Sequence, residues 1–233
     1  MKKRSILIAF MTIAGIFAAG QERITTRATS VDDLNEVLAS SRYLFPEFQD
    51  ARVILRNESL SVKMNYNALS GEMEYLDETG TPLSLWNKND VRAIVFSNRI
   101  FKYIPKGYVE ILSEMSSDVE LLVHRMFKEG DRKKIGAFGI ATNTSPIASI
   151  SQVTSDAGVH NLSIAEEVSY YKTHTYYLYA SGTYRLANKS GFKKVFGKQR
   201  PDMEEYLKSH PVNFTKAEDI IRLFTYCTES PDR

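Results

Sequence analysis

The 233-residue sequence predicts a mainly β protein of the α+β type, in which an antiparallel meander forms a curved sheet, half-barrel or sandwich and carries a short C-terminal helical unit. Three observations predict this fold. Apolar and polar residues alternate over many short runs, no long helical pattern separates these runs, and the apolar spacing becomes helical in the last forty residues.

Residues 1–20 have the features of a cleaved export signal. Basic residues at 2–4 precede an apolar run over 6–17, and small residues at 18–20 suit a cleavage site. The apolar run is shorter than the roughly 20 residues that a bilayer requires. We therefore expect a mature chain in the periplasm, secreted or at the cell surface, without a transmembrane span. Without the signal, 27 basic and 28 acidic residues remain, and this balance argues against a nucleic-acid partner.

The segment after the signal is polar and weakly patterned, which predicts a linker or short helix over 21–41. An antiparallel β domain is expected over 42–186. Near its start, Pro46 has no amide hydrogen to donate to a neighbouring strand, so a central position in a sheet is excluded. Residues 43–48 are therefore expected to form an edge strand or a docking segment.

The clearest element of the β domain is a hairpin. Residues 59–66 and 72–77 alternate between apolar and polar side chains around a loop that contains Gly71. Further on, residues 128–165 are rich in Gly, Ser and Thr and have few large apolar residues, which predicts a long loop. Other strands are expected at 91–96, 99–104, 108–112, 119–127, 167–179 and 183–186.

Short helices packed on the β domain are expected over 187–233. Asn188 or Ser190 can cap the first helix, and Pro201 suits the first turn of the second. The capping-box sequence from Thr215 to Glu218 predicts the start of the third. Helical spacing groups the apolar residues into three faces: Phe192, Val195 and Phe196; Met203, Tyr206 and Leu207; Ala217, Ile220, Ile221, Phe224 and Cys227.

Tyrosines are concentrated in the last long strand of the β domain. Alternation places Tyr170 and Tyr176 on one face of this strand, and Tyr171, Tyr177 and Tyr179 on the other. Aromatic side chains on both faces indicate either packing within the sheet or a groove for a glycan, a peptide or a lipid. These five tyrosines are candidate ligand-binding residues.

A basic patch is predicted around the first short helix. Its five cations, with no acid among them, are Lys189, Lys193, Lys194, Lys198 and Arg200. Such a patch suits lipopolysaccharide, an anionic glycan or an acidic partner, and the alternative is a solvated helix face. Lys193 and Lys194 are the candidate binding residues.

The sequence contains no pattern typical of a catalytic or metal site. The four histidines lack metal-ligand spacing, and no Gly-x-Ser-x-Gly or phosphate-loop sequence is present. Cys227 lies on an apolar helix face, where a buried thiol is expected. The carboxylates Glu72, Glu74 and Asp77 are the candidates for acid–base chemistry, and alternation places Glu72 and Glu74 on the solvent face. We expect no metal and no cofactor.

Four stretches together resemble a group of exported proteins of Bacteroidetes with no assigned activity: Tyr43 to Phe48, Met64 to Tyr75, Gly136 to Gly139, and Lys194 to Ile221. The resemblance implies an extracytoplasmic bacterial protein with a β-rich body and a helical tail, and it supplies no catalytic residue. The favoured hypothesis is a non-enzymatic binding protein of the cell envelope, whose partner is an envelope protein, a glycan or a lipid. The alternatives are a carrier of a hydrophobic ligand in a half-barrel and a hydrolase with scattered carboxylates.

Overall fold

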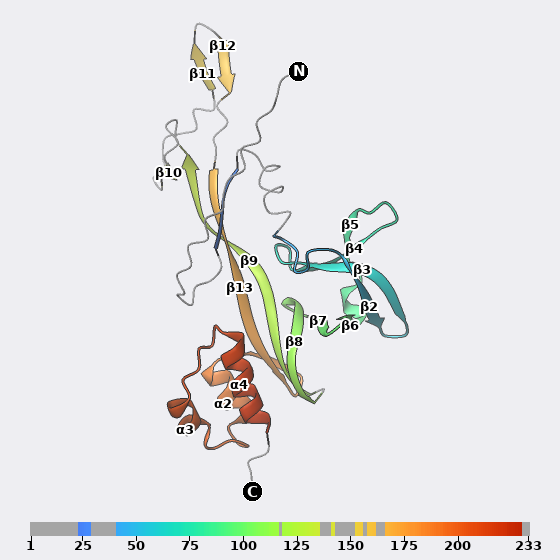
Figure 1. Cartoon of the computed structure of the whole chain (residues 1–233), viewed down its shortest axis with the longest axis vertical. Helices are drawn as coiled ribbons and strands as arrows, with labels where there is room; N and C mark the ends of the chain where they lie inside the picture. The colour runs from blue at the N-terminus through green and yellow to red at the C-terminus, as the bar shows by residue number, and fades with distance from the viewer. Residues whose placement is uncertain are drawn as a thin grey trace.

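The computed structural model describes residues 23–28, 41–116, 118–135, 141–142, 152–155, 158–161 and 166–229. The predicted signal at 1–20 lies outside these residues. One antiparallel sheet dominates the described part of the chain, and three short helices follow it (Figure 1). In spatial order the strands are β1 (Arg23–Ala28), β13 (Glu166–Ala180), β9 (Val119–Ile135), β8 (Gly107–Ser116), β7 (Arg99–Ile104), β6 (Val91–Phe96), β2 (Gln49–Leu55), β3 (Ser59–Asn67), β4 (Glu72–Leu76) and β5 (Pro82–Ser84).

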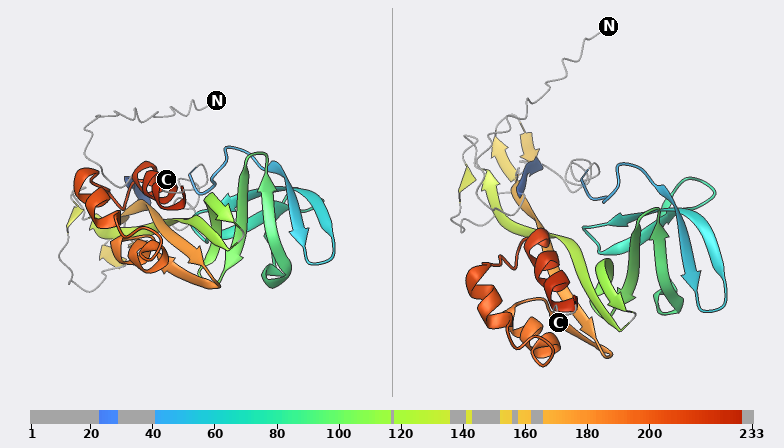
Figure 2. Two further views of the ribbon diagram at one scale, coloured as in Figure 1. Left: turned by 90° about the horizontal axis from the view of Figure 1, so that it is seen from below. Right: turned by 60° about the horizontal axis from the view of Figure 1, so that its bottom comes forward.

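Three smaller elements complete the sheet structure. Strand β10 (Ala141–Thr142) pairs with β9, and β14 (Thr183–Leu186) pairs with β13. A separate hairpin joins β11 (Gln152–Ser155) to β12 (Gly158–Asn161). The main sheet curls between β8 and β5 without closing, so the predicted fold class is confirmed as an open, curved antiparallel sheet (Figure 2).

The predicted hairpins are confirmed. Strands β3 and β4 pair around a turn in which Gly71 has φ +74°. A Cβ atom on Gly71 would lie 2.9 Å from Met126 Sδ on β9, so glycine suits both the backbone and the space. Strands β6 and β7 pair around Ser97 and Asn98, and β8 begins at Gly107, which has φ +112°.

Residues 43–48 dock beside the end of β3, as the proline predicted. Tyr43 forms an isolated antiparallel bridge with Asn67. The buried side chain of Asn65 accepts a hydrogen bond from Phe45 N and donates to Phe45 O and Glu47 O. Asn65 therefore replaces the ladder hydrogen bonds that are lost around Pro46.

Two expectations about irregular segments were wrong. Residues 23–28, expected to be part of a linker or short helix, form β1, an edge strand paired with β13. Residues 128–165, expected to be a loop, contain the second half of β9, which runs to Ile135, as well as β10, β11 and β12. The ladder between β9 and β13 supplies backbone hydrogen bonds whatever the side chains are, so few apolar residues were needed to extend β9 to Ile135.

Two hydrophobic cores lie on the same face of the sheet. The register aligns Phe101 of β7, Glu110 of β8, Val123 of β9 and Tyr176 of β13, so their side chains share this face. The first core, which we call the curl core, fills the inside of the curl. It consists of Ala51, Val53, Met64, Tyr66, Ala68, Met73, Val91, Ile94, Phe96, Phe101, Tyr108, Phe127 and Tyr170.

The second core, which we call the helical core, lies between the sheet and the helices. It consists of Leu121, Val123, Tyr176, Leu178, Ala187, Phe192, Phe196, Met203, Ile220, Leu223, Phe224 and Cys227. The opposite face of the sheet carries a smaller outer-face cluster of Ile104, Val109, Leu122 and Tyr177. The helices thus cover one face of the sheet, where α2 contacts β13 and α4 contacts β8 (Figure 2).

The three C-terminal helices are α2 (Lys189–Phe196), α3 (Met203–Ser209) and α4 (Ala217–Thr228). Asn188 caps α2, as predicted, because its side chain accepts a hydrogen bond from Gly191 N. The predicted capping box at α4 was wrong, since the Thr215 hydroxyl donates to Asn213 Oδ1 instead. The Asp219 carboxylate accepts a hydrogen bond from Asn213 N. A local turn, rather than a side-chain cap, therefore positions the start of α4.

Candidate functional site

The best candidate site is a cavity of about 200 Å³ between α2, α3 and the segment that joins them. Lys189 and Lys193 contribute from α2, one helical turn apart on one face. Arg200 contributes from the connecting segment. The full lining is Lys189, Lys193, Gly197, Arg200, Pro201, Met203, Glu204 and Leu207. We call this cavity the basic pocket.

Arg200 is the buried member of the basic pocket, with only 7% of its surface exposed. Its guanidinium lies 3.7 Å from the ring centre of Tyr226 on α4, and its Nη1 donates to Glu229 O at 3.0 Å. Its Nε is buried and makes no hydrogen bond, although Asp202 Oδ1 lies 3.4 Å away. Arg200 is therefore held in position by packing, while part of its hydrogen-bonding capacity is unused.

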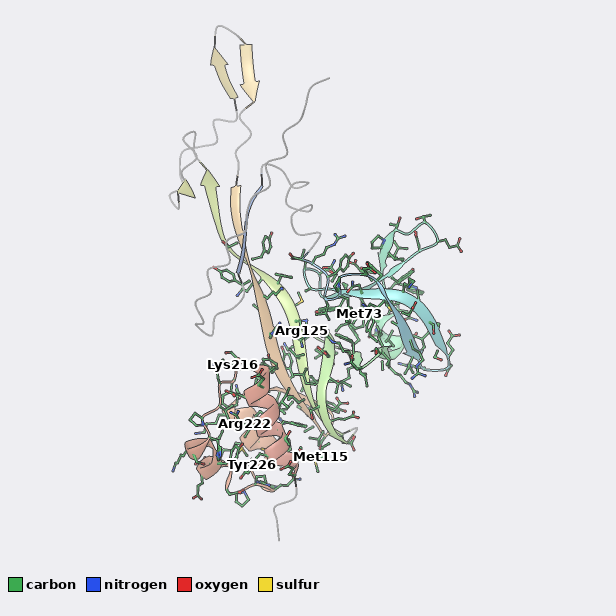
Figure 3. The ribbon with its side chains drawn as sticks, viewed as in Figure 1. Met73, Met115, Arg125, Lys216, Arg222 and Tyr226 are labelled. Carbon is green, nitrogen blue, oxygen red and sulfur yellow. The ribbon has the colours of Figure 1, made fainter. Side chains whose placement is uncertain are left out.

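A stacked column of planar groups supports Arg200. Tyr226 stacks on Tyr206 with a centroid distance of 3.7 Å, and Tyr206 stacks on His210 at 4.4 Å. The Tyr226 hydroxyl donates to Asp202 Oδ2 at 2.5 Å. Burial, followed by this hydrogen bond, raises the pKa of Tyr226, so its hydroxyl stays protonated and keeps donating. Figure 3 labels Tyr226 within the helical unit.

The two candidate lysines have different surroundings. Lys193 Nζ lies 2.7 Å from Glu204 Oε1, and both side chains line the basic pocket and are more than half exposed. The hydrogen bond from Lys193, followed by the charges of Lys193 and Lys189, lowers the pKa of Glu204. Lys194 is exposed and is not part of the pocket lining. An exposed ion pair stabilises little, so Lys193 is able to exchange Glu204 for another anion.

The five candidate tyrosines do not converge on one groove. Tyr170 belongs to the curl core and Tyr176 to the helical core, while Tyr177 and Tyr179 pack in the outer-face cluster. Tyr171 is half-buried on β13. Alternation along β13 therefore separates these side chains into different packing environments.

The outer-face tyrosines surround a cation of the chain itself. Lys102 Nζ lies 4.6 Å from the ring centre of Tyr179 and 5.8 Å from that of Tyr184, and it also pairs with the buried carboxylate of Glu120. Cation–π contact and ion pairing together satisfy this ammonium group. Lys102 thus occupies the aromatic surface formed by Tyr179 and Tyr184.

Sequence reasoning missed a charged network between the two cores. Glu110 accepts from Arg99 Nε at 2.6 Å and Arg99 Nη2 at 2.7 Å, and from Arg125 Nε at 2.8 Å. His174 Nε2 lies 3.4 Å from Arg125 Nη1, and the Tyr66 hydroxyl donates to Arg125 O. Arg125 is labelled between the helical unit and the curl in Figure 3. We call Arg99, Glu110 and Arg125 the charged belt.

One signal in the sequence pointed to the charged belt. Glu110 alternates with the apolar Val109 and Ile111 and shares its face with Tyr108, so an acid stands at an inward-facing position. Burial alone would raise the pKa of Glu110, but hydrogen bonds and charge from Arg99 and Arg125 outweigh it and lower this pKa. The Glu110 carboxylate therefore remains ionised at neutral pH and is paired with both arginines.

The carboxylates considered for acid–base chemistry all have structural partners. Glu72 pairs with Lys88, and only a quarter of its side chain is exposed, so its expected place on the solvent face was wrong. Glu74 accepts from the Tyr43 hydroxyl and from Asn67 Nδ2. Asp77 accepts hydrogen bonds from the turn that follows it, at Thr79 and Thr81. These partners hold the three carboxylates within separate local structures.

The remaining candidate groups are also accounted for. Cys227 is 4% exposed, and burial raises the pKa of its thiol to about 12, which confirms a buried, protonated side chain. No group of three or more His, Cys, Asp or Glu residues is arranged to hold a metal ion within the described residues. In the same part of the chain, no helix is long and apolar enough to cross a membrane.

Comparisons with known proteins return no match: no family model and no curated protein matches the sequence, and no solved structure matches the fold.

Proposed function

We propose that this protein is a non-enzymatic binding protein of the bacterial cell envelope, and that it engages an acidic partner through the surface around the basic pocket. The observation that carries the proposal is the convergence of Lys189, Lys193 and Arg200 on one cavity. Residues 189–204 contain five cations and two acids, so this surface carries a net charge of +3 on a chain that is otherwise close to neutral. The predicted export signal supports the location in the envelope.

The alternative of a hydrophobic-ligand carrier receives less support. Large side chains occupy the inside of the curl, where Tyr66, Phe96 and Phe101 are each at most 2% exposed. Cores packed in this way leave no room for a lipid chain without rearrangement. The alternative of a hydrolase is weakened by the structural partners of Glu72, Glu74 and Asp77.

The proposal is tested by the binding of separated envelope fractions to the immobilised protein. Lys189→Glu/Lys193→Glu reverses two charges of the pocket, and Lys63→Glu/Arg92→Glu makes the same charge change on exposed strand residues as the control. We expect one fraction to bind the natural protein and the control, and to lose binding to the pocket variant and at 0.5 M salt. Equal binding by both variants, or binding that resists salt, would contradict the proposal.

A further inference from the structure

The basic pocket carries a net positive charge, as a site for an anion requires. Its lining contains three cations, Lys189, Lys193 and Arg200, and one acid, Glu204. The lining therefore carries +2, and Asp202, which pairs with Arg200 from outside the lining, reduces the local charge to +1. This charge attracts a carboxylate, which supplies one negative charge, as well as a phosphate monoester, which supplies about 1.5 to 2 at pH 7.

The cations also approach the pocket from different directions. Lys189 and Lys193 extend from one face of α2, while Arg200 reaches the cavity from the segment before α3. A phosphate group presents three acceptor oxygens and can accept from several such donors at once. Ammonium groups act as point charges on phosphate, and a guanidinium adds a directional donor. A planar carboxylate has only two oxygens with which to meet three cations.

Arg200 supplies the buried positive charge of this pocket. It is held against Tyr226, and its buried Nε lies 3.4 Å from Asp202 Oδ1. A guanidinium fixed at the wall of the cavity attracts an anion without having to be ordered first. The cavity volume of about 200 Å³ equals that of about six or seven waters at roughly 30 Å³ each. A phosphate and part of the group that it esterifies fit this volume.

We propose that the basic pocket binds the phosphate of a phosphomonoester. This inference rests on the proposed function and specifies its ligand: the acidic partner carries a phosphate, either on a soluble molecule such as a sugar phosphate or on a lipid headgroup. Lys193 leaves Glu204 to contact the phosphate, Lys189 flanks it, and Arg200 forms the buried end of the site.

Glucose 6-phosphate and glucose are the soluble probes, and binding is measured by calorimetry on the full chain. We expect saturable binding of glucose 6-phosphate and none of glucose. Lys193→Ala should weaken binding by about tenfold, because a charge-assisted contact is lost. Lys194→Ala removes the same charge from the same helix outside the pocket and should change the affinity by less than about twofold. Equal losses in the two variants would mean diffuse attraction only and would overturn the proposal.

Glu204→Gln provides a test that folding defects cannot imitate. Because it removes the acid that competes for Lys193, it should tighten glucose 6-phosphate binding by several fold. Affinity should also fall between pH 7.5 and pH 5, because the ester loses its second charge near pH 6. Unchanged or weaker binding by Glu204→Gln would overturn the proposal.

Vesicles with phosphatidic acid, compared with vesicles of phosphatidylcholine, identify a lipid source of the phosphate. Binding to phosphatidic acid that depends on Lys193 but not on Lys194 assigns the site to a headgroup, and binding of glucose 6-phosphate alone assigns it to a soluble ester. If neither probe binds while an envelope fraction is still captured through Lys189 and Lys193, the phosphate assignment is overturned and the proposed function stands. If that capture is also lost, both are overturned.

Discussion

Removing the acid from the charged belt should destabilise the whole sheet. Glu110→Ala leaves Arg99 and Arg125 close together without their shared carboxylate, on the face between the two cores. Breaking a fully buried ion pair costs about 3–5 kcal/mol. The side chains of Arg99 and Arg125 are 25% and 21% exposed, so water compensates in part, and we expect a loss of about 2–3 kcal/mol. For a chain of this size, this corresponds to a fall in Tm of roughly 4–12 °C.

The loss is measured by urea unfolding followed by far-UV circular dichroism. Asp50→Ala is the control, because its ion pair with Lys63 is exposed and should contribute about 0.5 kcal/mol or less. The pKa of Glu110 is lowered in the folded protein, so its contribution is present above the unfolded value of about 4.3 and is lost as the pH falls through the lower folded value. Glu110→Ala and the natural protein should therefore converge in stability at low pH. A loss below 0.5 kcal/mol at pH 7, or a difference independent of pH, would refute the reasoning.

Three further predictions use matched positions. Gly71→Ala should lower the free energy of unfolding in urea by about 2 kcal/mol, and Gly80→Ala by about 1 kcal/mol. Both glycines have positive φ, but only Gly71 also lacks space for a Cβ, so equal losses would contradict the prediction. Cys227 should not react with a disulfide reagent at pH 8 until the protein unfolds, and rapid labelling of the native protein would disprove its burial. Asn188→Ala should lower the free energy of unfolding by about 1 kcal/mol, because the α2 cap is lost. Ser190 is exposed, so Ser190→Ala should leave this free energy nearly unchanged; the reverse order would assign the cap to Ser190.

The sequence predicted well those features that depend on neighbouring residues. Alternation located β3 and β4, and the need for positive φ located their turn at Gly71. The cap at Asn188 follows from the same kind of short-range chemistry. By contrast, β1 pairs with a strand more than 130 residues later in the chain, and nothing in its six residues identifies that partner. Long-range pairing is set by the sheet as a whole, so local patterns do not reveal it.

The part of the candidate site that depends on neighbouring residues was predicted, and the part that depends on distant residues was not. Lys193 was identified because cations cluster in the sequence near α2, and this cluster does border the basic pocket. The burial of Arg200 was not predictable, because it depends on Tyr226 from a helix that is separated from it by α3. The tyrosines of β13 were selected by composition alone, and the cores that surround the strand determine which of them are covered.

The two cores are joined by the strands that they share. Phe127 and Tyr170 lie in the curl core, while Val123 and Tyr176 lie in the helical core, although each pair comes from β9 and β13. Unfolding of either core would therefore expose one end of the same two strands, at the level of the charged belt. The ladder between β9 and β13 runs through both cores. We therefore expect the helices to unfold together with the sheet rather than as an independent unit. Reaction of Cys227 should accordingly report the unfolding of the sheet as well as that of the helices that bury its thiol.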